Sequence, residues 1–138
     1  MACEKHKLCR GEWKQMVNCL LIDKNPAERH RLHQILSDVG IHCEERDGAE
    51  EGIRFCQESS PDIVVMEASG VGAAKEFLRL VRYQGRQSDR PVVILYADKP
   101  NMESVGETII EGAADFLVKP FDRELLLFKL EQAGVISH

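Results

Sequence analysis

The sequence predicts a single α/β domain built on a five-stranded parallel sheet. Four short apolar runs and one further short strand segment recur along the chain, and each is followed by a segment with helix start and stop signals. Short continuous apolar runs are typical of strands that are buried on both faces of a parallel sheet. Parallel neighbours need right-handed crossovers, so helices are expected on both faces of the sheet. The 138 residues, of which 43% are apolar, suffice for one core.

The strands are predicted where the apolar runs stand between turn or capping residues. These runs are residues 19–22, 63–66, 91–96 and 116–118, and a further short strand is predicted around residues 41–45. A Ser-Gly-Val-Gly run at 69–72 leads into the third helix, and residues 101–111 are expected to form the fourth. Residues 84–90 are polar and are interpreted as a connector.

Capping residues define the first, second and fifth helices. Asn25 is expected to cap the first helix, with Pro26 at its first position and Gly40 at its end. Asp47 is expected to cap the second helix, and Asp122 the fifth. The buried face of the first helix is predicted to contain Leu32, Ile35, Leu36 and Val39.

Charge and cysteine content restrict the class of function. The chain has 23 Asp and Glu against 18 Lys and Arg, so we expect no general attraction to nucleic acid or to a membrane surface, and a protein partner instead. Five cysteines, an odd number without a signal-peptide core before them, predict free thiols and a cytoplasmic location.

The first sixteen residues carry no apolar period and precede the first strand. We therefore expect residues 1–16 to be a flexible extension ahead of a domain at 17–138. Within the extension, Cys3, His6 and Cys9 lack the paired spacing of zinc modules, so no metal site is predicted there. His30 and His33 have helical spacing, but a solvated helix face is the better interpretation.

Charged and aromatic residues stand at the carboxyl ends of four predicted strands, where open parallel sheets bind their ligands. They are Asp23 and Lys24 after the first strand, Glu67 after the third, Tyr96 at the end of the fourth and Lys119 after the fifth. If the strand order is flavodoxin-like and doubly wound, these side chains converge on one shallow pocket.

The five-fold alternation, the acids after the first and third strands and the Lys119-Pro120-Phe121 run make residues 17–136 resemble the response-regulator receiver family. The stretch GAADFLVKPF at 112–121 is especially similar to single-domain regulators of the chemotaxis type. The resemblance implies a (βα)5 receiver that acts in bacterial two-component signalling. It also implies a partner such as a histidine kinase, a phosphotransferase or an effector protein, or a second copy in a homodimer.

The resemblance assigns a role to each residue of the predicted pocket. In the family, two adjacent acids hold Mg²⁺, an Asp accepts the phosphoryl group, a small hydroxyl residue contacts that group and a Lys neutralises it. Here Asp23 keeps the first acid and Lys119 keeps the lysine, whereas Lys24 stands in place of the second acid. Glu67 replaces the acceptor, and Tyr96 replaces the hydroxyl residue.

These replacements predict a degenerate phosphorylation pocket. Lys24 puts an ammonium where a divalent cation must bind, so we expect Mg²⁺ binding to be weak or lost and no cofactor to be held. Glu67 is one methylene longer than Asp, and a misplacement of about 1 Å can cost roughly a hundredfold in rate. We expect instead a permanent ion-pair network of Asp23 and Glu67 with Lys24 and Lys119.

Phe116 occupies the position of the family's switch aromatic. We expect the ring of Tyr96 to fill the space that a small hydroxyl residue would vacate, so that Phe116 does not alternate between two rotamers.

The function predicted from the sequence is a non-enzymatic pseudo-receiver that binds a protein through its fourth helix, fifth strand and fifth helix, without phosphorylation. Two alternatives stay open. One is phosphorylation by an atypical route at Glu67 or Asp23. The other is cyclic-dinucleotide binding, because an R-x-x-D pattern at 86–89 lies among four arginines, namely Arg79, Arg82, Arg86 and Arg90.

Overall fold

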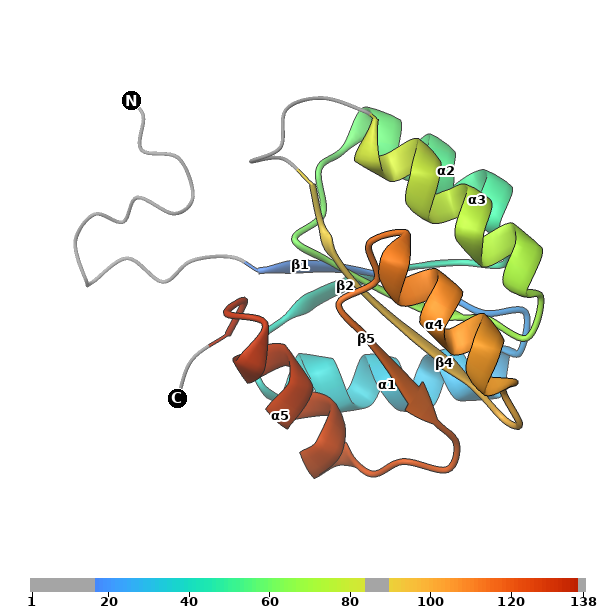
Figure 1. Cartoon of the computed structure of the whole chain (residues 1–138). Coiled ribbons are helices and arrows are strands. Elements are labelled where there is room, and N and C mark those ends of the chain that lie inside the picture. The colour runs from blue at the N-terminus through green and yellow to red at the C-terminus, as the bar shows by residue number, and fades with distance from the viewer. Residues whose placement is uncertain (1–16, 84–89, 137–138) are drawn as a thin grey trace.

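The protein is described by a computed structural model that covers residues 17–83 and 90–136. Within them, five strands alternate with five helices (Figure 1). The strands are β1 (Asn18–Ile22), β2 (His42–Arg46), β3 (Ile63–Glu67), β4 (Val92–Ala97) and β5 (Asp115–Val118). The helices are α1 (Pro26–Asp38), α2 (Ala49–Glu58), α3 (Val71–Arg82), α4 (Met102–Ile110) and α5 (Arg123–Gln132).

The five strands form one parallel sheet in the order β2-β1-β3-β4-β5. The predicted flavodoxin-like, doubly wound architecture is therefore confirmed. Helices α1 and α5 cover one face of the sheet, and α2, α3 and α4 cover the other (Figure 1). The winding reverses between β1 and β3, which places the carboxyl ends of these two strands at the switch point where such sheets bind ligands.

The sheet separates two hydrophobic clusters, one under each helix layer. The cluster beneath α1 and α5 includes Leu32, Leu36, Leu126 and Leu130, each fully buried. The cluster on the other face is built around Phe77 of α3. Burying a side chain of this size contributes about 1.5–3 kcal/mol, so the two clusters together fix both helix layers to the sheet.

Side-chain caps start α1 and α5 where the sequence predicts them. The carboxamide oxygen of Asn25 accepts a hydrogen bond from the backbone N–H of Ala27 at 2.9 Å. The carboxylate of Asp122 accepts one from the N–H of Leu125, also at 2.9 Å. Such caps contribute about 1 kcal/mol each.

Two local predictions are wrong. The N-cap of α2 is Gly48, without a side-chain bond, because the carboxylate of Asp47 instead accepts a hydrogen bond from the guanidinium of Arg29 at 3.2 Å. Val39 does not belong to the buried face of α1 and is 39% exposed. It is the C-cap of the helix, where the backbone leaves helical geometry and the helical period no longer applies.

Several predictions concern residues outside those that the structure describes. Residues 1–16, with Cys3, His6 and Cys9, are among them, and so are residues 84–89 of the predicted connector. Among the described residues, no helix combines the length and the apolar character that a bilayer span requires.

Candidate functional site

A hollow of about 380 Å³ lies at the carboxyl ends of β1 and β3, beside the first turns of α2 and α3. Its lining includes Asp23 and Lys24 after β1, Asp47 and Gly48 before α2, and Glu67 at the end of β3. The hollow therefore lies at the switch point of the sheet and collects three of the five residues that the sequence predicts for the pocket.

Asp23 is the buried acid of this site. It is 6% exposed, and both oxygens of its carboxylate accept hydrogen bonds. One bond comes from the hydroxyl of Tyr96 at 2.5 Å and the other from the backbone N–H of Asn25 at 2.9 Å. Its backbone carbonyl also accepts a bond from the guanidinium of Arg29 at 2.5 Å. A carboxylate with two donors is satisfied although it is buried.

Tyr96 reaches Asp23 from the end of β4. Its side chain is 1% exposed. Burial, and then the hydrogen bond to Asp23, raise the pKa of Tyr96 far above its ordinary value, so its hydroxyl remains a protonated donor. The ring meets that of Phe121 edge to face at 5.6 Å, and the ammonium of Lys119 lies 5.5 Å from the ring centroid of Tyr96.

Glu67 and Lys24 occupy the more open part of the site. The carboxylate of Glu67 accepts hydrogen bonds from Ser69, one from the backbone N–H at 3.2 Å and one from the hydroxyl. Lys24 is exposed at the rim of the hollow. Glu67 is thus held by its own loop, as expected for a short polar side chain two residues further along the chain.

The predicted ion-pair network is wrong in this structure. For the four residues concerned, all of them described, no carboxylate of Asp23 or Glu67 lies within 4.0 Å of the ammonium of Lys24 or Lys119. Neutral donors take the place of the predicted cations. Convergence on one pocket also holds only in part, because Tyr96 and Lys119 are not in the lining of the hollow.

Phe116 lies on the other face of the sheet from Tyr96. The ring of Tyr96 belongs to the cluster beneath α1 and α5, whereas Phe116 packs against the cluster on the opposite face. In the β4–β5 register, Tyr96 pairs with Leu117 and Phe116 pairs with Leu95. The expectation that the Tyr96 ring fills the space next to Phe116 is therefore wrong. We still predict that Phe116 keeps one rotamer, but the position of the Tyr96 ring no longer supports this prediction.

Two residues of the site escaped the sequence analysis. Arg29 joins the loop after β1 to the end of β2, since its guanidinium also contacts Glu45 at 3.0 Å. Ser69 holds Glu67. Their signals were local ones: Arg29 lies in the first turn of α1, and Ser69 follows Glu67 by two residues, a spacing that favours a side-chain turn.

Two of the arginines and one of the histidines that suggested other sites are bound to glutamates elsewhere in the fold. Arg79 and Arg82 of α3 both contact the carboxylate of Glu111, each at 3.3 Å. Arg86 lies outside the described residues. His33 bonds to Glu45 at 2.7 Å. No cluster of three or more potential metal-ligating side chains occurs within residues 17–83 and 90–136.

A doubly wound sheet with acids after its first and third strands and a lysine after its fifth defines a class of signalling domain, the receivers of two-component systems. The model of the response regulator receiver domain matches residues 19–131, and the chain belongs to this family. Sequence and fold thus indicate the same family. Lys24, Glu67 and Tyr96 are positions at which this chain differs from the family pattern given above.

Known relatives support this assignment at two levels. Protein PilH of Pseudomonas aeruginosa is 27% identical over 81% of this chain and 93% of its own length. The structure of the chemotaxis response regulator CheY4 of Vibrio cholerae is 26% identical, has a TM-score of 0.74, and covers 88% of this chain and 99% of that one. The chain spans about half of longer relatives, such as 49% of the transcriptional regulatory protein PhoP of Escherichia coli.

A more distant structure shares the fold alone. The receiver domain of Saccharomyces cerevisiae Ssk1, crystallised with the histidine phosphotransfer signalling protein Ypd1, is 18% identical with a TM-score of 0.72, over 86% of this chain and 89% of that one.

Proposed function

We propose that this chain is a receiver that signals by binding a protein partner and does not accept a phosphoryl group. The observation that carries the proposal is the hydrogen bond between the buried hydroxyl of Tyr96 and the carboxylate of Asp23. The first acid of the family's site is bound by the protein's own tyrosine, and the second acid is replaced by Lys24.

The side chains present at the site are a poor set of ligands for Mg²⁺. This ion demands near-octahedral coordination by oxygen ligands, usually carboxylates, phosphates and waters. Both oxygens of Asp23 already accept hydrogen bonds, and the ammonium of Lys24 stands at the same rim. Binding of the ion would have to break a buried charge-assisted bond and bring two cations together, so we infer that Mg²⁺ affinity is weak or lost.

Glu67 is unsuited to act as the phosphoryl acceptor. Its carboxylate is held by the N–H and hydroxyl of Ser69, and its extra methylene carries the reactive oxygen beyond the position of an aspartate oxygen. Without the metal and with a misplaced nucleophile, in-line transfer loses both charge neutralisation and positioning. The domain is then a binding module and not an enzyme.

An exposed apolar surface on α4, β5 and α5 supports the binding role. Its side chains are Met102 and Ile110 of α4, Val118 of β5, and Leu125 and Phe128 of α5. We call this set the α4–β5–α5 surface. Exposed large apolar side chains that gather in one region are candidates for an interaction site. A histidine kinase, a phosphotransferase or an effector protein in the cytoplasm is the proposed partner, and the Ssk1 receiver offers a precedent with Ypd1.

Phosphorylation is tested by incubating the full chain with Mg²⁺ and acetyl phosphate and measuring its intact mass. We expect no phosphoryl adduct on the native chain. The matched control is the triple variant Lys24→Asp, Glu67→Asp and Tyr96→Thr, which restores the family's residues and should gain an adduct under the same conditions.

An adduct on the native chain would contradict the proposal. Peptide mapping of such an adduct to Glu67 or Asp23 would favour an atypical phosphorylation route instead.

A further inference from the structure

Two cysteines face each other across neighbouring strands at the end of the sheet remote from the candidate site. Cys19 of β1 and Cys43 of β2 are register partners in the parallel ladder. Both side chains enter the cluster beneath α1 and α5, at 1% and 6% exposure. Adjacent strands lie about 4.7–4.9 Å apart, within the Cα separation of roughly 4.4–6.8 Å that a disulfide allows.

The two thiols differ in acidity because they interact with each other. Burial, and then the neighbouring thiol of Cys43, raise the pKa of Cys19, whose Sγ donates to the backbone carbonyl of Leu20 at 3.7 Å. The neighbouring thiol of Cys19 lowers the pKa of Cys43, whose Sγ donates to the backbone carbonyl of Ile41 at 3.9 Å. Thiolate is the form that reacts with oxidants. Cys43 is therefore suited to be the first sulfur oxidised, with Cys19 beside it as the second.

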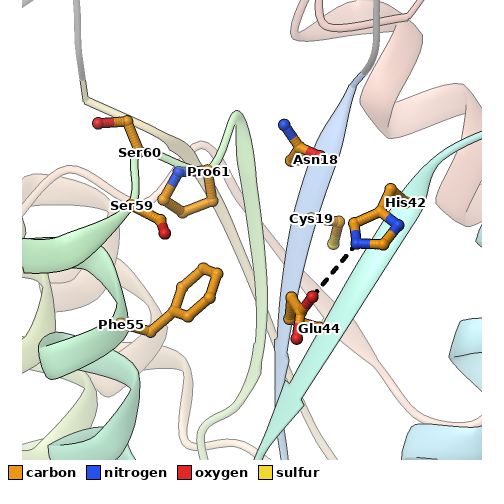
Figure 2. A pocket seen from close by; sticks show the side chains of 8 residues that line it. All are labelled: Asn18, Cys19, His42, Glu44, Phe55, Ser59, Ser60 and Pro61. Atoms are coloured by element: carbon orange, nitrogen blue, oxygen red, sulfur yellow. Dashed lines mark hydrogen bonds and ion pairs between the residues drawn. The ribbon is translucent and has the colours of Figure 1, made fainter.

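A hollow of about 240 Å³ opens beside this end of β1 and β2, and Cys43 is not in its lining. One wall carries Asn18, Cys19, His42 and Glu44, and the other carries Phe55, Ser59, Ser60 and Pro61 (Figure 2). Figure 2 shows the ring of His42, which bonds to Glu44 at 3.2 Å. The hollow lies on the α2 face, whereas both thiols enter the cluster on the other face of the sheet. A peroxide would therefore reach them by local opening of β2, which is an edge strand with no further strand outside it among the described residues.

We propose that Cys19 and Cys43 form a peroxide-oxidisable pair that closes into an intramolecular disulfide between β1 and β2. The thiolate of Cys43 attacks one oxygen of hydrogen peroxide, the O–O bond breaks, and a sulfenic acid and hydroxide result. The thiol of Cys19 then attacks the sulfenic sulfur. The S–S bond forms, the S–O bond breaks, and the hydroxyl leaves as water with the proton of Cys19. The hydroxide takes up the proton that Cys43 released on ionising, so the two sulfurs lose two electrons and the peroxide becomes two waters.

The disulfide would join the two strands that carry acids into the candidate site. β1 leads to Asp23, and β2 leads to Asp47. Both residues line the hollow of the candidate site, at the carboxyl ends of the strands. Oxidation would thus restrict the edge strand β2 relative to β1. The thiol pair would react whether or not Glu67 accepts a phosphoryl group, so its chemistry is independent of the function proposed above.

The pairing is tested on the reduced full chain with hydrogen peroxide. After oxidation, free thiols are blocked with N-ethylmaleimide in denaturant, and the protein is digested without reductant and mapped by mass spectrometry. We expect a linked peptide that contains Cys19 and Cys43, loss of both labels, and recovery of both after dithiothreitol. Cys56 is the internal comparison and should keep its label, because burial raises its pKa to about 11.

The folded state must direct the pairing. Oxidation in denaturant should give mixed pairings, and a Cys3→Ser, Cys9→Ser background removes the two cysteines that lie outside the described residues. Retention of both labels at peroxide concentrations that oxidise Cys56 would overturn the proposal, and so would native pairing of Cys43 with another cysteine. Both of these outcomes can be observed on the native chain. The test therefore does not depend on whether a variant at Cys19 or Cys43 folds.

Discussion

At the scale of single residues, the hydroxyl of Tyr96 determines how the candidate site is held together. It donates to the carboxylate of Asp23 at 2.5 Å from a side chain that is 1% exposed. A hydrogen bond to a buried carboxylate is charge-assisted and stronger than one between neutral groups. Because the pKa of Tyr96 is raised, this donor persists through the pH range in which the fold is studied. A neutral tyrosine hydroxyl thus binds the carboxylate that the sequence analysis expected lysines to pair with.

Replacing Tyr96 by phenylalanine should weaken the fold. The Tyr96→Phe variant keeps the ring but leaves one oxygen of Asp23 buried without its donor, which costs about 1–3 kcal/mol. We expect a loss of that size in the free energy of unfolding, measured by urea denaturation. Tyr83→Phe is the matched control, because Tyr83 is 76% exposed and should be unaffected. Equal stability of the two variants would show that the bond contributes nothing.

The positions of the candidate residues could be read from the sequence, but their partners could not. Asp23, Glu67 and Lys119 follow apolar runs, and that order along the chain is local information. Whether Tyr96 faces Asp23 or Phe116 depends on the register of β4 against β5, where Tyr96 pairs with Leu117. A register is set by non-local packing. The sequence analysis therefore placed Tyr96 correctly at the end of its strand, near Asp23, and was wrong only in expecting its ring beside Phe116.

At the scale of elements, the alternation of strands and helices was predictable because its signals are short-range. The caps at Asn25 and Asp122 lie within three residues of the N–H groups that they satisfy. The cap predicted at Asp47 failed because Arg29, from another helix, offers a charged donor to the same carboxylate. Local capping rules hold where no distant group competes for the cap.

Two helical glycines should respond in opposite directions to alanine. A Cβ at Gly52 of α2 would press against the buried side chain of Ile22 and would lie 3.5 Å from the ring of Phe77, whereas nothing lies within 4 Å of one at Gly106 of α4. We expect Gly106→Ala to add about 0.5–1 kcal/mol to the free energy of unfolding. Gly52→Ala should lower it, because overpacking costs about 1–3 kcal/mol. Thermal or urea unfolding measures both.

Gly106→Ala is the reference for helix propensity alone, since both substitutions remove a glycine from a helix. A gain in stability at Gly52 equal to that at Gly106 would mean that Ile22 moves aside without cost, and that the contact between α2 and β1 is looser than the structure indicates.

At the scale of the whole molecule, the fold separates three regions. The switch point carries Asp23 and Glu67, the opposite end of the sheet carries the Cys19–Cys43 pair, and the α4–β5–α5 surface lies at the β5 edge (Figure 1). The topology was predictable because right-handed crossovers leave few alternatives. The apolar residues of the surface could not be identified from sequence, since Leu126 is buried and Leu125 exposed on the same helix.

The α4–β5–α5 surface should bind its partner with an affinity that phosphodonors do not change. Phe128 is 51% exposed on α5, and truncating an aromatic anchor typically weakens binding by about tenfold or more. Phe128→Ser should therefore raise the Kd for a histidine kinase or phosphotransferase from the same cell by at least that factor, in isothermal titration calorimetry. Tyr83→Ser, at the exposed end of α3, is the control and should leave the Kd unchanged.

Because Asp23 is bound by Tyr96, Mg²⁺ and acetyl phosphate should not alter the Kd of the native chain. Tighter binding in their presence would show that the site still responds to phosphorylation.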